Sequence, residues 1–120
     1  MDASADEREV RAARNQAIFR AANEKIVRMN KRFGDFDTID VSCECADVNC
    51  TALLQIGADE YASIRRSPRT FAVLADHVFP DVERVVIRKD GYAVVEVIGH
   101  GIEVAEATHT TGPDGFGARA

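Results

Sequence analysis

The chain has 120 residues and a formal net charge of −5 at pH 7, a length that fits one compact domain because domains cluster at about 100–150 residues. Its 46% hydrophobic and 29% charged residues, with 8 Gly and 3 Pro, exclude collagen-like, low-complexity and wholly disordered classes. No apolar run approaches the roughly 18 residues of a membrane span, and the N-terminus lacks a secretory pattern. We therefore expect a cytoplasmic protein that does not enter a membrane.

The first predicted element is a long helix over residues 6–33. This segment has no Pro or Gly, and five apolar residues follow one another at spacings of three or four: Ile18, Ala22, Ile26, Met29 and Phe33. Such spacing places the apolar side chains on one helix face, which we expect to pack on a sheet. Acids near the start, bases near the end and Gly34 after the last apolar residue agree with helix capping and with the helix dipole.

The charge of this helix differs from that of the rest of the chain. Residues 1–9 carry −3, residues 10–33 carry +6 and residues 34–120 carry −8. The seven cations of the middle segment are Arg11, Arg14, Arg20, Lys25, Arg28, Lys31 and Arg32. We expect them on a solvated arc or docked on an acidic surface. Nucleic-acid binding through the helix is an alternative because cations neutralise phosphates, but the acidic remainder would repel a duplex.

The length of the helix suggests an interface. At about 1.5 Å per residue it spans roughly 40 Å, whereas strands of six residues reach about 20 Å. The helix should therefore overhang the sheet. We expect four residues of its N-terminal half to pack against a second copy in a homodimer: Val10, Ala13, Ala17 and Ile18. A further protein partner of unknown identity is also expected.

Shorter elements follow in chain order. Strands are predicted over residues 38–43 and 52–56, a helix over 58–66 with Tyr61 and Ile64 inward, a strand over 70–74, and a hairpin of 82–89 with 92–98. Asp90-Gly91 in that hairpin suits a two-residue turn with positive φ at both positions. Residues 107–120 are small, polar and glycine-rich, so we expect a disordered tail. Residues 1–106 then form a single α+β domain, with the long helix on a small, mainly antiparallel sheet.

Three cysteines lie close together at Cys43, Cys45 and Cys50. An odd number so closely spaced is a poor disulfide framework, and in a reducing compartment it indicates metal or thiol chemistry. A structural zinc usually takes four Cys or His ligands, so one ligand is missing from the cluster.

We expect the fourth ligand to be a histidine elsewhere in the chain. His109 falls in the predicted tail and His100 lies between glycines, whereas His77 follows a predicted strand. The pattern Cys43-x-Cys45-x4-Cys50-x26-His77 therefore predicts a zinc site. Four protein ligands would leave no position for a reactive water, so the metal would be structural.

The same residues carry a family resemblance. The matching segments are VSCECADVNC, ADEYASIRRSPRTFAVLADHVFPDVERVV, GYAVVEV and EREVRAARNQAIFRAANEKI, which together cover most of residues 7–98. They resemble a family of small, uncharacterised actinobacterial proteins with a Cys-x-Cys, a third Cys and a Gly-His, where this chain has Asp76-His77. The resemblance implies a shared fold and the grouping of His77 with the cysteines. It implies no activity, substrate or partner.

No catalytic constellation or nucleotide-binding motif occurs in the sequence, so we expect no enzyme and no catalytic residues. Arg65, Arg66 and Arg69 are expected to be surface charge near a helix end. The sequence favours a small zinc-binding regulatory or interaction module. Besides nucleic-acid binding through the basic helix, two alternatives stay open: a thiol-based redox or zinc sensor, and a metal-dependent enzyme if water replaces His77 in an open site.

Overall fold

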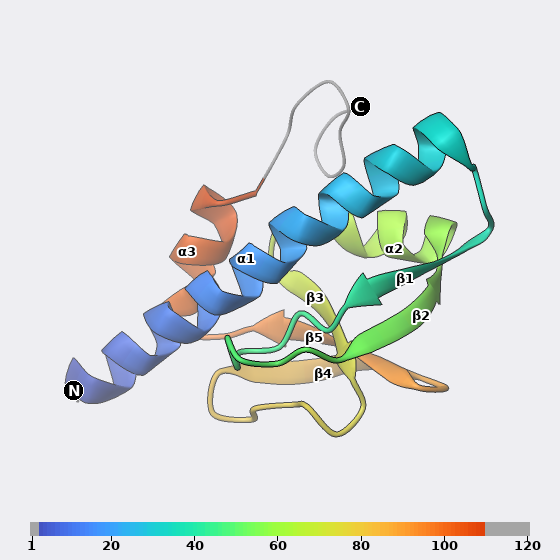
Figure 1. The fold of residues 1–120 in the computed structure, drawn as a ribbon. Helices are drawn as coiled ribbons and strands as arrows, with labels where there is room; N and C mark the ends of the chain where they lie inside the picture. Colours follow the sequence, from blue (N-terminus) through green and yellow to red (C-terminus); the bar gives the residue numbers. More distant parts are fainter. Residues whose placement is uncertain (1–2, 110–120) are drawn as a thin grey trace.

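The computed structural model describes residues 3–109, which form an α+β arrangement of helices and two antiparallel sheets (Figure 1). The elements in order are α1 (Ala3–Phe33), β1 (Thr38–Ser42), β2 (Leu53–Gly57), α2 (Ala58–Arg65), β3 (Thr70–Leu74), β4 (Glu83–Lys89), β5 (Tyr92–Val97) and α3 (Gly101–Ala107). The predicted fold class and every predicted strand are confirmed, and each strand bound lies within one residue of its predicted position. The helix predicted over 6–33 begins earlier, at Ala3.

Every strand pair in the two sheets is antiparallel. β1 pairs with β2, and the second sheet has the order β3-β5-β4. The backbone N–H of Glu44, just beyond β1, donates to the carbonyl oxygen of Ala72 in β3 at 2.8 Å. The two sheets are therefore linked directly, beside the segment that carries the cysteines.

The β4–β5 hairpin has the predicted two-residue turn, because Lys89 pairs with Tyr92. Its predicted geometry is wrong in one respect. Gly91 has a φ of +85°, but Asp35 is the one described non-glycine residue with a positive φ, so Asp90 does not share it. Glycine alone supplies the left-handed conformation here.

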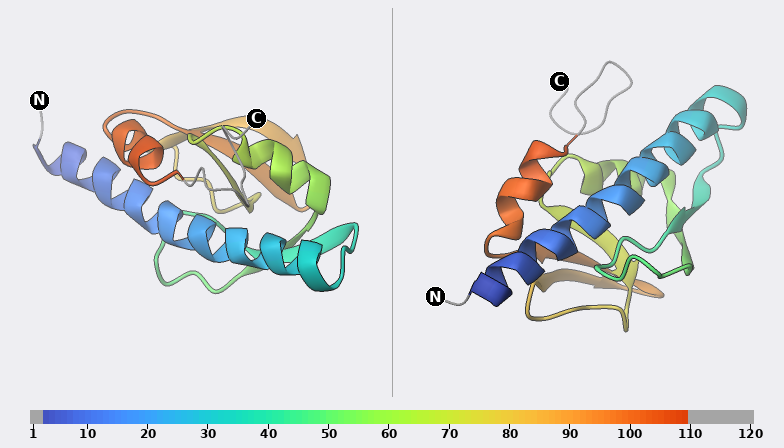
Figure 2. Two further views of the ribbon diagram at one scale, coloured as in Figure 1. Left: turned by 90° about the horizontal axis from the view of Figure 1, so that it is seen from above. Right: turned by 60° about the vertical axis from the view of Figure 1, so that its left-hand side comes forward.

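Helix α1 crosses both sheets, and its N-terminal half lies beside α3 (Figures 1 and 2). The sequence did not predict α3, since Gly99 and Gly101 are typical of a loop. A Cβ added to Gly101 would lie 3.1 Å from the Cβ of Ala13, so glycine permits the close approach of the two helices. Ala13, placed by the sequence in a homodimer interface, is instead fully buried within the chain.

The predicted inward face of α1 is wrong. Ile18, Met29 and Phe33 are exposed by 58%, 60% and 76%. The buried residues of α1 are instead small or polar: Ala12, Ala13, Gln16, Arg20, Asn23, Glu24 and Val27. Arg20, expected on the solvated arc, is 1% exposed and donates to the carbonyl oxygens of Pro68 and Ala105. The buried polar side chains of α1 donate hydrogen bonds to β4, α3 and β1.

The main apolar core lies between the two sheets, α2 and the C-terminal half of α1. It contains Ile39 and Val41 of β1, Phe71 of β3 and Val95 of β5. Tyr61 and Ile64 of α2 face inward as predicted. Within residues 3–109, no helix is both long enough and apolar enough to cross a membrane.

The predicted domain boundary after residue 106 lies inside α3, which ends at Ala107. Thr108 and His109 are also held in place, by hydrogen bonds to Arg20 and to the carbonyl oxygen of Arg65. Residues 110–120 of the predicted tail lie outside the described part of the chain.

Candidate metal centre

The four residues that the sequence grouped lie together in space. Cys43 and Cys45 follow β1, Cys50 precedes β2, and His77 follows β3. One ligand atom from each residue lies within 4.8 Å of the others. The structure therefore contains a Cys3His cluster that could hold a metal ion.

Backbone hydrogen bonds place each ligand. The Cys43 N–H donates to the carbonyl oxygen of Ala52 at 3.0 Å, which continues the β1–β2 pairing past the strand ends. Cys43 and Cys45 can then share one side of an extended segment, because side chains alternate along it. The Cys50 N–H closes a turn on the carbonyl oxygen of Asp47 at 3.0 Å. The His77 N–H closes another on the carbonyl oxygen of Leu74 at 2.9 Å.

The distances at the histidine suit tetrahedral zinc. His77 Nδ1 lies 3.5 Å from Cys43 Sγ and 3.6 Å from Cys50 Sγ. Zinc bonds of about 2.3 Å to sulfur and about 2.05 Å to nitrogen, at a tetrahedral angle, separate those two atoms by about 3.6 Å. The other ring nitrogen, Nε2, lies 3.8 Å from Asp76 Oδ1. Nδ1 is therefore the ring atom placed to coordinate.

The thiols differ in acidity. A hydrogen bond from Cys43 lowers the pKa of Cys45 to about 5. That same hydrogen bond, together with burial, raises the pKa of Cys43, and burial raises the pKa of Cys50. The Leu74 N–H donates to Cys43 Sγ at 3.2 Å, which stabilises negative charge on that sulfur. A bound dication would deprotonate all three thiols.

The cluster has a closed side and an open side. Cys43 and Cys45 are 0% and 1% exposed, whereas Cys50 and His77 are half-buried. A metal held here would be anchored in the core by two ligands and reached from solvent past the other two.

A buried polar network lies on the opposite side of the cysteine segment, and the sequence analysis missed it. Glu44 is fully buried and accepts hydrogen bonds from the Tyr61 hydroxyl, from Asn23 Nδ2 at 2.9 Å and from the Ala72 N–H at 3.0 Å. Its carboxylate lies 3.7 Å from Arg65 Nη2, so the prediction that Arg65 is surface charge is wrong. The available signal was the alternation that turns Glu44 away from the sulfurs.

The other histidines lie away from the cysteines. His100 Nδ1 is 3.0 Å from Asp6 Oδ1 and 3.2 Å from Glu9 Oε1, so this ring is paired with carboxylates of α1. His109 Nε2 lies 3.0 Å from the carbonyl oxygen of Arg65. Among the three histidines, His77 is therefore the one that the fold brings to the sulfurs.

Comparison with protein-family models, with curated proteins and with solved structures finds no match to this chain.

Proposed function

We propose that the protein binds one zinc ion through Cys43, Cys45, Cys50 and His77, and that the ion is structural. The observation that carries the proposal is the position of His77 Nδ1, 3.5 Å and 3.6 Å from two of the sulfurs. Thiolate-rich sets with one imidazole are the donors that structural zinc prefers. With four protein ligands, no coordination position remains for a reactive water.

The role proposed for the ion is to fasten two loops together. Three ligands lie between β1 and β2, and the fourth lies between β3 and β4. One ion would therefore hold the β1–β2 hairpin against the second sheet, and its binding free energy would add to the free energy of folding. A site of this kind suits a small cytoplasmic regulatory or interaction module without catalysis.

Metal analysis of the purified, reduced protein tests the proposal. We expect about one zinc per chain, as for a closed four-ligand site, and cobalt substitution should give the visible absorption bands of a tetrahedral thiolate complex. Cys50→Ser and His77→Ala should lower zinc occupancy. His100→Ala is the matched control, because His100 is paired with carboxylates elsewhere, and it should keep its zinc. Full zinc occupancy in His77→Ala would refute the four-ligand assignment and favour the metalloenzyme alternative, with water in the fourth position.

A thiol-based zinc sensor is the second candidate, and the half-buried state of Cys50 favours it. Oxidants reach accessible thiolates first, and two oxidised thiolates that join as a disulfide no longer hold zinc. Hydrogen peroxide applied to the zinc-loaded protein separates the two roles. A sensor would release zinc and rebind it after reduction with a thiol, whereas a structural site would retain it.

A further inference from the structure

One face of α1 is exposed to solvent along most of the helix. Four large apolar side chains lie on it and on the turn that follows: Ile18, Met29, Phe33 and Phe36, exposed by 58%, 60%, 76% and 69%. They are half of the eight exposed large apolar residues of the described chain. We call this surface the α1 outer face. Its apolar content is high for a face that meets only water.

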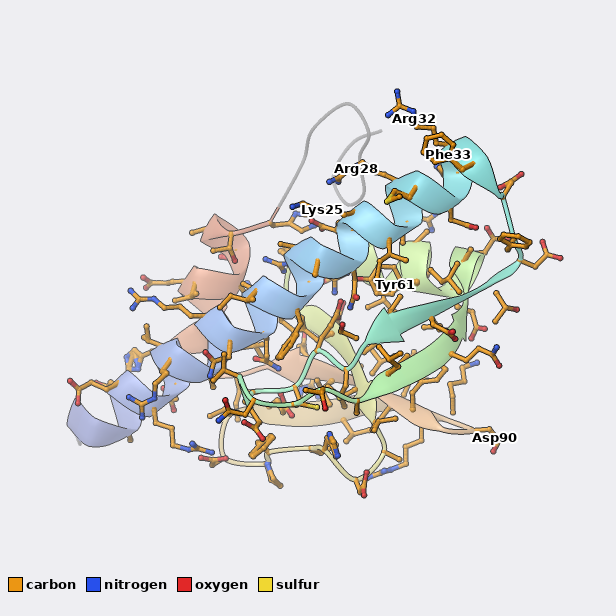
Figure 3. All side chains as sticks on the ribbon, in the orientation of Figure 1. Lys25, Arg28, Arg32, Phe33, Tyr61 and Asp90 are labelled. Atoms are coloured by element: carbon orange, nitrogen blue, oxygen red, sulfur yellow. The ribbon has the colours of Figure 1, made fainter. Side chains whose placement is uncertain are left out.

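The charge of the α1 outer face is of one sign. Between residues 10 and 33 the one acidic residue, Glu24, is buried, while cations follow the exposed side of the helix. Lys25, Arg28, Arg32 and Phe33 point away from the sheets (Figure 3). No carboxylate among residues 3–109 forms an ion pair with Arg11, Arg14, Lys25, Lys31 or Arg32. Elsewhere, cations at the surface do pair: Arg8 with Asp81, Arg69 with Glu106, Arg84 with Glu96 and Lys89 with Glu60.

The aromatic end of this face is held in place. Asn30 Nδ2 donates to the carbonyl oxygen of Phe36, and the Phe36 N–H donates to Asn30 Oδ1, both at 2.9 Å. A Cβ added to Gly34 would lie 2.5 Å from the Phe36 ring, so glycine lets the ring lie close to the helix end. A groove of about 370 Å³ runs beside Met29, Phe33 and Phe36. The Phe36 ring is therefore positioned before any partner arrives, which lowers the entropy lost on binding.

We propose that the α1 outer face binds an acidic amphipathic segment of another protein, with apolar side chains in the groove and carboxylates along Lys25 and Arg32. The complementary charge would orient the segment, and the apolar anchors would supply affinity. This proposal rests on the interaction role proposed above but not on the metal. The groove also touches Asp40, which would confine the carboxylates of the partner to the α1 side.

Charge argues against the other occupants. Six of the seven cations between residues 10 and 33 are not buried, the exception being Arg20. A second copy docked through the same face would bring these six cations against the same six of the first copy, and like charges repel. A duplex or an anionic membrane would meet Asp35 and Asp37, both exposed next to Phe36, and would leave the groove unfilled. An acidic segment with apolar anchors matches both the cations and the groove.

Peptide binding to the full chain tests the proposal. The probe is a fluorescein-labelled amphipathic peptide of about 15 residues, a length at which helices can begin to form, with Glu on its polar face and Leu on its apolar face. A peptide with Lys in place of Glu is its control. Fluorescence anisotropy should show binding of the Glu peptide, weakened by salt, and a dissociation constant at least about tenfold larger for the Lys peptide.

Two double variants locate the site. Phe33→Ser with Phe36→Ser, and Lys25→Glu with Arg32→Glu, should each raise the dissociation constant about tenfold or more. The matched control is Val86→Ser with Ile87→Ser on β4, where two exposed apolar residues also lie among arginines, and binding should not change. All six residues are exposed, so unfolding temperatures should stay near the wild-type value.

Several results would overturn the proposal. The proposal is wrong if the Glu peptide does not bind, if the Glu and Lys peptides bind equally, or if the two double variants bind the Glu peptide as the wild type does. Sedimentation showing a dimer that Phe33→Ser with Phe36→Ser dissociates would assign the face to a second copy. Preferred binding to phosphatidylserine vesicles or to duplex DNA would assign it to those anions. Zinc content is measured on the same samples. A loss of peptide binding with normal zinc content would count against this proposal alone, and a loss of zinc with normal peptide binding would count against the metal proposal alone.

Discussion

Glu44 separates the two buried cysteines and belongs to a different structural unit from them. Its neighbours contribute sulfur to the metal centre, while its carboxylate joins Asn23 of α1, Tyr61 of α2 and the backbone of Ala72 in β3. Arg65 supplies the facing charge at 3.7 Å. A short extended segment thus holds the metal ligands on one side and fixes two helices on the other.

Glu44→Gln should destabilise the fold strongly. The amide keeps the size of the side chain but leaves the buried Arg65 without its counter-charge, and breaking a buried pair in this way costs about 3–5 kcal/mol. Urea unfolding of the zinc-loaded protein measures the loss. Glu60→Gln is the control, because Glu60 is exposed although it accepts a hydrogen bond from the Tyr92 hydroxyl at 2.7 Å. Similar losses in the two variants would show that the charge of Glu44 is unimportant.

Glu83 is a second buried carboxyl group with a different consequence. Burial raises its pKa to about 7, and the nearby Cys45 and Asp81 act in the same direction. Its oxygens accept hydrogen bonds from the Phe79 N–H at 2.9 Å and from Gln16 Nε2 at 2.6 Å. Because the carboxyl is more acidic in the unfolded chain, the folded state binds the extra proton between about pH 4.5 and 7. Its contribution therefore makes the fold less stable as pH rises through that range.

Glu83→Gln should remove this pH dependence. At about pH 5 the variant and the wild type should have similar free energies of unfolding, whereas at about pH 8 the variant should be more stable by on the order of 2 kcal/mol. A flip of the Gln16 amide would let its Oε1, which has no described hydrogen-bond partner, accept from the new amide. Urea unfolding at both pH values measures the difference in the free energy of unfolding. The pH dependence that comes from the Cys and His residues of the cluster is common to both proteins and cancels in this difference. A variant less stable at the higher pH would contradict the argument.

At the scale of elements, α1 shows that helical periodicity predicts a helix but not which of its faces is buried. The spacing of Ile18, Met29 and Phe33 correctly predicted a helix, but the most apolar face is not the buried one. The inward face instead provides Arg20, Gln16 and Asn23, each hydrogen-bonded to another element. Hydrogen bonds across elements depend on partners distant in sequence, so periodicity could not have found them.

Arg20→Met tests whether these polar contacts hold the helix. Arg20 donates to the carbonyl oxygens of Pro68 at 2.8 Å and Ala105 at 3.1 Å, and its guanidinium lies 5.0 Å from the centre of the Phe71 ring. Methionine would remove a donor from both carbonyl oxygens and leave Ala105 with only the longer hydrogen bond from the Thr108 hydroxyl at 3.4 Å, so unfolding should become easier by about 2–4 kcal/mol. The control is Arg14→Met on the exposed side, expected within about 0.5 kcal/mol of wild type. Thermal unfolding compares them, and equal effects would mean that α1 is held by its apolar contacts alone.

The sheets were more predictable than the helices that cover them. Runs of β-branched residues, the Asp90-Gly91 turn and Pro68 after α2 are local signals, and β3 has the bounds that were predicted. Helix α3 was not predicted because Gly101, whose missing side chain lets α3 approach Ala13, is a residue type that is typical of loops. The Cys3His cluster was predictable from residue types together with the position of His77 after a predicted strand, whereas the role of Glu44 depended on contacts with three other elements.

In the whole molecule, the Cys3His cluster lies where the two sheets meet. Residues 38–56 include few large apolar residues, a composition that predicts a hairpin with little to hold it in the absence of an ion. In the structure, however, Ile39, Val41, Leu54 and Ile56 are buried in the same core as Phe71. The β1–β2 hairpin therefore has apolar contacts of its own. An ion bound by the Cys3His cluster would therefore stabilise the loops that supply its ligands more than the strands.

Zinc removal should accordingly loosen the site without unfolding the sheets. Chelation should lower the unfolding temperature, because a ligand that binds the native state alone stabilises it by mass action. In the chelated protein, hydrogen exchange should become faster at the backbone N–H groups of Cys50 and His77, which close the two ligand loops. Exchange at Val94 and Val95, buried in the central strand β5, should stay slow. Loss of protection at β5 would instead mean that the ion holds the entire fold, and unchanged exchange in both loops would mean that the cysteines and His77 position themselves without a metal.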